Sequence, residues 1–230
     1  MGGQACVFYG AAQVSKDVDF VVYSDADNFE RLLRAFGELN AARIAVPRFD
    51  PDLLARGHAV HFRCQAAGVE GLRVDVMTQL RELADFNVLW NRRTSFADDT
   101  GSEFHLLCVP DLVTAKKTQR SKDWPMIELL VTIHHRENAA APRSDWIEFW
   151  LLESRTPDLV VRLCRDFPAE ATSLQTRRTL LTIAHSGDLD ALRAALDAEV
   201  RVEQAKDRAY WEPLRKELEQ FRHAERGQSV

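Results

Sequence analysis

The sequence predicts an α+β protein in which a small mixed β-sheet, flanked by helices, is followed by an α-helical bundle. Strand signals are confined to the first half, where β-branched and aromatic residues gather in four short runs: 15–22, 59–64, 72–77 and 104–109. After residue 142 no run has strand character, and apolar residues recur at helical spacing. Strands that come first and helices that come last are typical of the α+β class.

The clearest linker signal is the segment Ala139-Ala140-Ala141-Pro142. We expect one domain over residues 1–138 and a helical domain over residues 143–226. Residues 227–230 are expected to form a disordered tail, because polar chain ends are rarely tied down. The 230 residues suffice for two such parts with filled cores.

The composition is ordinary for a globular protein, with 46% hydrophobic and 28% charged residues. A net charge of −5 excludes the global basic footprint of a nucleic-acid binder, so a polyanionic partner would need a local patch. The four cysteines are widely spaced and never in CxxC, which favours a reducing cytoplasm over a zinc site or a disulfide framework. We expect no membrane association, because the sequence shows neither a signal peptide nor a bilayer-length apolar run.

The chain begins with a glycine pair, Gly2-Gly3, and residues 4–9 are expected to form a short helix after it. The pair is typical of a tight turn, yet no strand or helix leads into it. Two interpretations stay open. Either a preceding element is missing from this sequence, or the glycines have an unusual role.

The run 15–22 is expected to form a strand with an acidic face. Side chains two apart on a strand point the same way, so Asp17 and Asp19 project together, while Val18 and Phe20 are expected to face a core. Two adjacent carboxylates repel each other, and a divalent cation such as Mg²⁺ or Mn²⁺ removes that cost. The alternative is an edge strand with a solvated acidic face.

A helix is expected from Asp25 to about Asn40, since apolar residues recur at helical spacing and Asp27 and Glu30 have the spacing of a capping box. Beyond it, the runs 59–64 and 72–77 are separated by a glycine-rich segment. This spacing predicts two strands joined by a hairpin-like turn.

Asp75 is a lone acid in the third of these strands. It is expected on the face opposite Val74 and Val76, with Arg73 as its neighbour on that face. An unpaired buried charge is costly, so Asp75 is expected to pair with Arg73, to face solvent, or to lie beside Asp17 and Asp19. The last arrangement would complete a cluster of three carboxylates.

Basic residues occur in two later segments. Arg92 and Arg93 follow Trp90, and the helix expected after Pro110 carries a group of cations: Lys116, Lys117, Arg120 and Lys122. Each group is either a solvated surface or a site for a phosphate or an acceptor. The remaining apolar patterns predict helices over 124–136, 146–152, 159–167, 174–185 and 189–223, the last interrupted at Pro213.

A glycine turn, an Asp-x-Asp strand and a later lone Asp together favour phosphoryl or nucleotidyl transfer. Glycine amides can approach a triphosphate closely because no Cβ intervenes. Two Mg²⁺ ions about 3.5–4 Å apart can bridge the attacking and leaving oxygens of an in-line displacement. Such a pair needs shared carboxylates, and the third acid can deprotonate an acceptor hydroxyl.

Gly2-Gly3 followed by Asp17-Val18-Asp19, and then Arg73-Val74-Asp75-Val76-Met77, resembles the DNA polymerase β-type nucleotidyltransferase superfamily. The similarity is greatest to small bacterial nucleotidyltransferases, including the AbiEii-type toxin relatives. The segment 109–123 is similar to the Lys-rich helix of these proteins, and the resemblance covers about residues 1–136. One departure is the Gly-Gly pair, where many members have Gly-Ser; Ser15 could substitute, although it lies nearer the carboxylates.

The resemblance implies a nucleotidyltransferase fold and a Mg²⁺- or Mn²⁺-dependent transfer of an NMP from an NTP to a hydroxyl or phosphate acceptor, with release of pyrophosphate. It assigns the acids and the nucleotide-binding groups as follows: Asp17, Asp19 and Asp75 as metal-binding and catalytic, and Gly2, Gly3, Ser15, Lys116 and Lys117 as nucleotide-binding. The acceptor stays open between RNA, above all tRNA, and a small molecule. The alternative is a non-catalytic nucleotide-binding or interaction module. We expect a second copy or a protein partner, if any, at the C-terminal helices.

Overall fold

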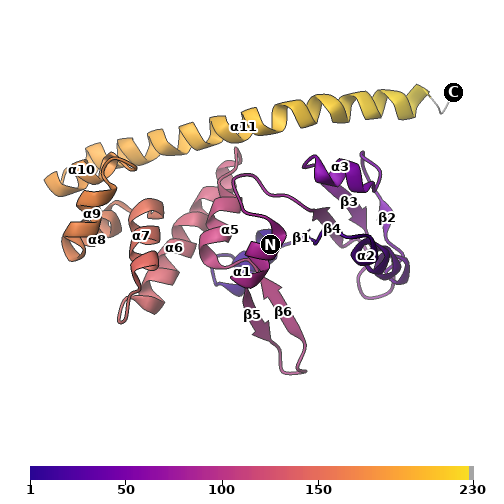
Figure 1. Cartoon of the computed structure of the whole chain (residues 1–230), viewed down its shortest axis with the longest axis horizontal. Coiled ribbons are helices and arrows are strands. Elements are labelled where there is room, and N and C mark those ends of the chain that lie inside the picture. The colour runs from indigo at the N-terminus through magenta and orange to yellow at the C-terminus, as the bar shows by residue number, and fades with distance from the viewer. Residues whose placement is uncertain (228–230) are drawn as a thin grey trace. The chain divides into compact units, whose positions relative to one another are not determined.

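The computed structural model of the chain describes residues 1–227, which form two compact units (Figure 1). The first contains residues 1–8, 12–115 and the described part of 209–230, and the second contains residues 9–11 and 116–208. This division differs from the predicted one in three places. Residues 9–11 and residues 116–138 belong to the unit with the helices, and the described residues from 209 on belong to the unit with the sheet. Of the predicted tail, Gly227 ends that helix, and residues 228–230 lie outside the described residues.

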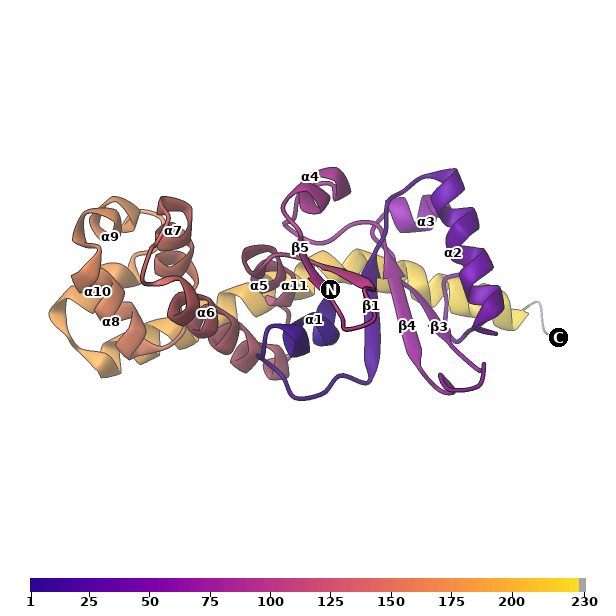
Figure 2. The ribbon, with the colours of Figure 1, turned by 90° about the horizontal axis from the view of Figure 1, so that it is seen from below.

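The protein is α+β, with a mixed four-stranded sheet in its N-terminal part and a long helical region after it. The elements of the first unit are α1 (Gly2–Phe8), β1 (Asp17–Val21), α2 (Ala26–Glu38), β2 (Ala42–Arg43), α3 (Pro51–Ala55), β3 (Val60–Arg63), β4 (Arg73–Met77), α4 (Phe86–Asn91), β5 (Thr94–Ala97), β6 (Glu103–Leu106) and α5 (Val109–Lys116), whose last residue falls in the second unit. The strand order is β1-β4-β3-β2, with β1 parallel to β4 and the other pairs antiparallel. Figure 2 shows β1, β4 and β3 of this sheet. β5 and β6 form a separate hairpin.

One face of the sheet is the core of the first unit. Alternate residues of β3 and β4 are buried there, and they pack against side chains from α2 and α3; the cluster contains Val60, Phe62, Val74, Val76, Phe29, Phe36 and Leu54. The predicted alternation around Asp75 is confirmed. Phe20 was expected to face this core and is instead 45% exposed. The reason is that β1 is the edge strand, whereas the core side chains come mainly from β3 and β4.

The second unit is helical. Its elements are η1 (Ser121–Asp123), α6 (Trp124–Asn138), α7 (Ser144–Glu153), α8 (Pro157–Asp166), α9 (Pro168–Leu174), α10 (Leu180–Ser186) and α11 (Leu189–Gly227), which continues into the first unit after residue 208. Trp150, Leu163 and Leu181 are fully buried and anchor its core. Among residues 1–227, none of the helices has the length and apolar character needed to cross a membrane.

Several sequence predictions were wrong in detail. The N-cap of α2 is Asp25, whose carboxylate accepts hydrogen bonds from the amides of Asp27 and Asn28, so Asp27 lies inside the helix and is not its cap. The helix predicted over 174–185 is α10, which begins only at Leu180 because residues 175–179 form the turn after α9; α9 itself was not predicted. α11 is not interrupted at Pro213. α3, α4 and β5 were not predicted, since short elements carry little periodic signal.

Candidate functional site

The parallel pairing of β1 with β4 brings the predicted acids onto one face of the sheet. Asp19 is the register partner of Asp75, and Asp17 is the partner of Arg73. His61 on β3 is the partner of Asp75 from the other side. Because register partners share a face and residues two apart on a strand do too, all five side chains project from the face opposite the core. We call this group, Asp17, Asp19, His61, Arg73 and Asp75, the carboxylate face.

Asp75 is the most enclosed acid of this face, with its side chain 13% exposed. The guanidinium of Arg73 donates to both of its oxygens, from Nε to Oδ1 at 2.8 Å and from Nη2 to Oδ2 at 3.0 Å. His61 Nδ1 lies 2.8 Å from the same Oδ1. Burial acts to raise the pKa of Asp75, but hydrogen bonds and charge from His61 and Arg73 outweigh it and hold the pKa below its ordinary value. The sequence alternative of an Arg73–Asp75 pair is therefore present, on the same face as Asp17 and Asp19.

All three acids of the carboxylate face affect the pKa of Arg73. Its pKa is raised, first by the hydrogen bond to Asp75 and also by the charges of Asp17 and Asp19. The guanidinium is thus the positive centre of an otherwise acidic face. Sequence reasoning considered Arg73 only as a partner of Asp75, and it missed His61, whose approach depends on the pairing of β3 with β4.

The two glycines lie in the first turn of α1 and not in a separate turn before it. Gly2 has φ +73°, and a Cβ built on it would lie 1.8 Å from Asp19 Oδ2. A Cβ on Gly3 would lie 2.4 Å from Ser15 Oγ. Ser15 Oγ in turn donates to the carbonyl of Asp17 at 2.9 Å, and the backbone nitrogen of Met1 donates to the carbonyl of Asp19 at 2.9 Å. The sequence needs glycine here because α1 approaches the acidic strand more closely than any side chain permits.

The donor chemistry of the carboxylate face fits a hard divalent cation, since three carboxylates offer the oxygen ligands that Mg²⁺ and Mn²⁺ prefer. Because Gly2 has no side chain, its backbone lies close to Asp19, one of these acids. Even so, within residues 1–227 no three side chains of the types His, Cys, Asp and Glu are already arranged to hold a metal ion. Both oxygens of Asp75 already accept hydrogen bonds, Oδ1 from Arg73 with His61 beside it and Oδ2 from Arg73.

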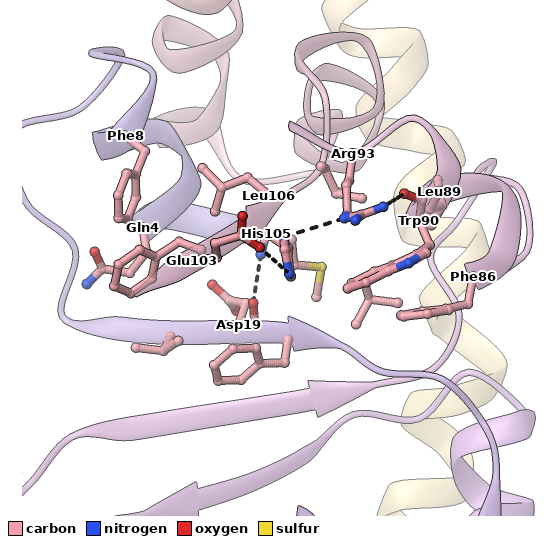
Figure 3. A pocket seen from close by; sticks show the side chains of 16 residues that line it. Gln4, Phe8, Asp19, Phe86, Leu89, Trp90, Arg93, Glu103, His105 and Leu106 are labelled. Atoms are coloured by element: carbon pink, nitrogen blue, oxygen red, sulfur yellow. Dashed lines mark hydrogen bonds and ion pairs between the residues drawn. The ribbon is translucent and has the colours of Figure 1, made fainter. Parts of the chain in front are cut away.

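A cavity of about 520 Å³ opens beside Asp19, within the first unit (Figure 3). Its walls come from α1, β1, α4 and β6, and they are mainly aromatic and apolar: Phe8, Val18, Phe20, Phe86, Trp90 and Phe104. The polar side chains of the lining are Gln4, Asp19, Arg93, Glu103 and His105. The guanidinium carbon of Arg93 lies 3.9 Å from the ring centroid of Trp90, and Arg93 Nη1 donates to the Trp90 carbonyl at 2.7 Å. We call this cavity the aromatic pocket.

The sequence signal for the aromatic pocket is weak. Trp90 and Arg93 lie in a short basic segment that the sequence predicts as either a solvated surface or a binding site. Trp90 is 39% exposed, more than a tryptophan in a core would be. Arg92, by contrast, forms an ion pair with the buried Asp111, its Nε 2.6 Å from Oδ2, which is a structural contact.

The predicted nucleotide-binding lysines belong to the second unit, and each forms an ion pair there. Lys116 is buried, with Nζ 3.2 Å from Oδ1 of Asp123, and Lys117 Nζ lies 2.6 Å from Oε1 of Glu153. Asp123 also accepts hydrogen bonds from Thr118 and Arg120. The contacts of Asp123 hold residues 116–120 at the start of α6, and the ion pair of Lys117 joins them to the end of α7. The nucleotide-binding role of both lysines stays a prediction.

Asp123 gives the helical unit a testable dependence on pH. Burial acts to raise its pKa, but the charge of Lys116, the hydroxyl of Thr118 and the charge of Arg120 outweigh it, so the pKa lies below the ordinary 3.8. A lowered folded-state pKa stabilises the protein above the unfolded value, and this contribution is lost as the pH falls through the folded value. The free energy of unfolding should therefore change little with pH near neutrality and decline below about pH 4.

Asp123→Asn should lower the free energy of unfolding by about 2 kcal/mol at pH 7, because Lys116 loses its counter-charge. Urea unfolding between pH 3 and about pH 7 measures both effects, since this range spans the carboxyl titration. As the pH falls, the free energy of unfolding should also decline less in the variant than in the wild type. An equal decline in both proteins would show that other acids cause it.

The carboxylate face can thus bind a cation or a cationic group, and Asp75 can accept a proton once its present partners move away. The aromatic pocket beside it can enclose a flat, partly apolar ligand. Comparisons of this chain with protein-family models, with curated proteins and with solved structures found no match.

Proposed function

We propose that the protein is a Mg²⁺-dependent nucleotidyltransferase that moves an NMP from an NTP to a hydroxyl or phosphate acceptor and releases pyrophosphate. One observation carries the proposal: the register of β1 and β4 places Asp19 beside Asp75, with Asp17 on the same face. Two acids at i and i+2 and a third from the neighbouring strand are the arrangement that a shared divalent cation needs. Mn²⁺ is the expected substitute.

Asp17, Asp19 and Asp75 would hold the metal, which when bound would neutralise charge on the reacting phosphates. Asp75 is ionised at neutral pH, because its pKa is held low, and its Oδ2 is the atom proposed to accept the proton of the acceptor hydroxyl. Gly2 and Gly3 keep the backbone of α1 close to Asp19 and Ser15, an approach that a side chain at either position would block.

The aromatic pocket supports a nucleotide as the donor. It adjoins Asp19, its volume is in the range of small-ligand sites, and a nucleobase can stack on an exposed tryptophan ring. Arg93 and His105 can meet the polar edge or the phosphates of such a ligand. Arg93 and His105 do not distinguish between the two acceptor classes, RNA such as tRNA and small molecules.

The test is a transfer screen with each of the four labelled NTPs, Mg²⁺ or Mn²⁺, and two acceptor pools, total RNA and small hydroxyl-bearing molecules. We expect labelled product and pyrophosphate in one pool only, abolished by EDTA. Absence of transfer with every NTP and both pools, from protein shown to be folded, would overturn the proposal.

A second function has one specific observation in its favour. Asp75 is held by Arg73 and His61, so the acids are not pre-arranged for a metal. A non-catalytic nucleotide-binding module with the same fold would tolerate this arrangement. Calorimetry with Mg²⁺ and NTPs separates the two, because a module binds nucleotide without turnover.

The aromatic pocket yields a prediction of its own. Trp90→Leu should weaken the binding of a non-hydrolysable ATP analogue with Mg²⁺ about tenfold, since base stacking on an aromatic ring contributes about 1–3 kcal/mol. Trp146→Leu is the matched control, because Trp146 also lies under an arginine, with the guanidinium carbon of Arg143 4.5 Å from its centroid, but belongs to the second unit. Calorimetric affinities that fall equally in both variants would remove the nucleobase from the pocket.

A further inference from the structure

A second cavity, of about 400 Å³, lies beside the aromatic pocket in the first unit. The two cavities share Val21, Phe86 and Trp90 in their linings, and Figure 3 shows Phe86 and Trp90 together at one side of the aromatic pocket. The rings of Phe86 and Trp90 are stacked, with their centroids 5.7 Å apart, and form a wall common to both cavities. We call the second cavity, which is also lined by Arg31, the Arg31 cavity.

The Arg31 cavity is positively charged. Arg31 is the only charged side chain among the described residues that line it, whereas the lining of the aromatic pocket includes the acids Asp19 and Glu103. Arg31 is exposed, and within residues 1–227 its side chain forms neither an ion pair nor a hydrogen bond. A guanidinium binds a phosphate through two parallel hydrogen bonds and repels an ammonium group. The cavity therefore favours an anionic ligand over a cationic one.

The other groups of the lining suit a nucleobase. Tyr23 is 43% exposed, and its ring centroid lies 5.5 Å from that of Phe86. Asn28 lies three residues before Arg31 on α2, so both side chains are on the same face of the helix. The amide of Asn28 donates to the Tyr23 carbonyl at 2.8 Å, and Asn87 offers a second amide. Aromatic rings for the base, amides for its edge and a cation for its phosphate together recognise a nucleotide.

The Arg31 cavity also adjoins the carboxylate face. Val21 follows Asp19 by two residues on β1, so the two side chains share a face and lie about 7 Å apart along the strand. Asp19 itself lines the aromatic pocket. The two cavities thus lie next to the same acid, as the sites of two substrates that react with each other must.

We propose that the Arg31 cavity binds the acceptor of the transfer and that this acceptor is a nucleoside phosphate. The proposal rests on the proposed function, because only a transferase needs a second substrate site beside that of its donor. A hydroxyl oxygen of the bound nucleotide forms a bond to the α-phosphorus of the NTP, the bond from that phosphorus to pyrophosphate breaks, and the hydroxyl proton passes to Asp75. The acceptor nucleotide is either the end of a single-stranded RNA or a free nucleoside monophosphate.

The experiment measures binding without turnover, by the fluorescence anisotropy of a short labelled single-stranded RNA titrated with the full chain. Arg31→Gln should weaken RNA binding roughly tenfold, the effect of one charged hydrogen-bonded contact. It should also reduce the slope of log affinity against log salt by about 0.7, the value for one phosphate contact on a single strand. Arg31→Lys keeps the charge and should restore most of the affinity and the slope.

Arg34→Gln is the matched control. Arg34 lies three residues after Arg31 on α2 and is exposed, but it does not line the cavity. Its loss should change RNA affinity by no more than about twofold at 0.15 M salt. Tyr23→Leu should weaken RNA binding roughly tenfold with an unchanged salt slope, because it removes a stacking ring but no charge. Tyr23 does not line the aromatic pocket, so this variant should bind a non-hydrolysable ATP analogue as the wild type does.

Competition identifies the source of the nucleotide. Unlabelled nucleoside monophosphates should displace the RNA, whereas an amino sugar and the ATP analogue with Mg²⁺ should not. Monophosphates that bind more weakly than the RNA assign the cavity to an RNA end, and monophosphates that bind at least as tightly assign it to a free nucleotide.

The outcomes separate this inference from the proposed function. Weaker RNA binding in Arg31→Gln and Tyr23→Leu but not in Arg34→Gln supports the inference. Equal binding in Arg31→Gln and the wild type, displacement of the RNA by the ATP analogue or the amino sugar, or no binding of RNA or monophosphates overturns it, and the transfer screen still decides the proposed function. RNA binding as expected, without transfer from any NTP, overturns the proposed function and the acceptor role with it. If Arg31→Gln fails to fold by circular dichroism, Tyr23→Leu decides by the same loss of RNA binding.

Discussion

Replacing Asp17 and Asp19 together with asparagine is expected to reduce nucleotidyl transfer at least about 1,000-fold, the scale seen when a central electrostatic group of an active site is removed. Asparagine keeps the size of each side chain but not its charge, and a neutral amide is a poor ligand for Mg²⁺. Asp17 is exposed and Asp19 is half-buried, so the fold should tolerate the change. Relief of the repulsion between the acids should give a small gain in stability, which thermal unfolding measures.

The measurement is the initial rate of labelled NMP transfer at saturating Mg²⁺, with circular dichroism to confirm the fold. Asp99→Asn is the matched control, since Asp99 is an exposed acid of the same unit, located in the loop between β5 and β6. It should leave the rate unchanged. Transfer that persists in the folded double variant would remove both acids from the mechanism.

The local part of this site could be predicted from the sequence because strand geometry is regular. A period of two decides which side chains share a face, so the common direction of Asp17 and Asp19, and the face of Asp75, followed from their spacing. What joins them is the parallel register of β1 and β4, which pairs residues more than fifty positions apart. No local pattern specifies such a pairing. From the sequence, a position of Asp75 beside Asp17 and Asp19 is therefore only one of three possible arrangements.

The partners of Asp75 show the same limit. Arg73 is two residues away on the same strand and was foreseen as a partner, whereas His61 arrives from β3 through the antiparallel register. The aromatic pocket depends on α4 and on the β5–β6 hairpin, short elements without a clear period, whose packing beside β1 is a tertiary feature. The units of the structure differ from the predicted domains at their C-terminal boundary, because α11 is continuous through residue 208, where the units divide.

Gly2→Ala is expected to lower transfer about a hundredfold, because a displacement of about 1 Å at a catalytic group has effects of that size. The added Cβ would lie 2.5 Å from Cγ and 2.8 Å from Cβ of Asp19, atoms that cannot swing away as a side-chain tip can. Asp19 or α1 must therefore move. The left-handed φ of +73° adds strain for any L side chain, and we expect a loss of about 1–2 kcal/mol in the free energy of unfolding.

The control is another glycine-to-alanine change in the same unit. Gly37 lies in the last turn of α2, and a Cβ there would meet nothing within 4 Å. Gly37→Ala should leave transfer unchanged and keep or raise stability by up to about 1 kcal/mol, since alanine favours the helix. Rates and urea unfolding of the two variants thus separate a general effect of alanine from the close approach of α1 to Asp19. Full activity in Gly2→Ala would show that the position of Asp19 does not depend on that approach, and the glycine pair would lose its assigned role beside the carboxylate face.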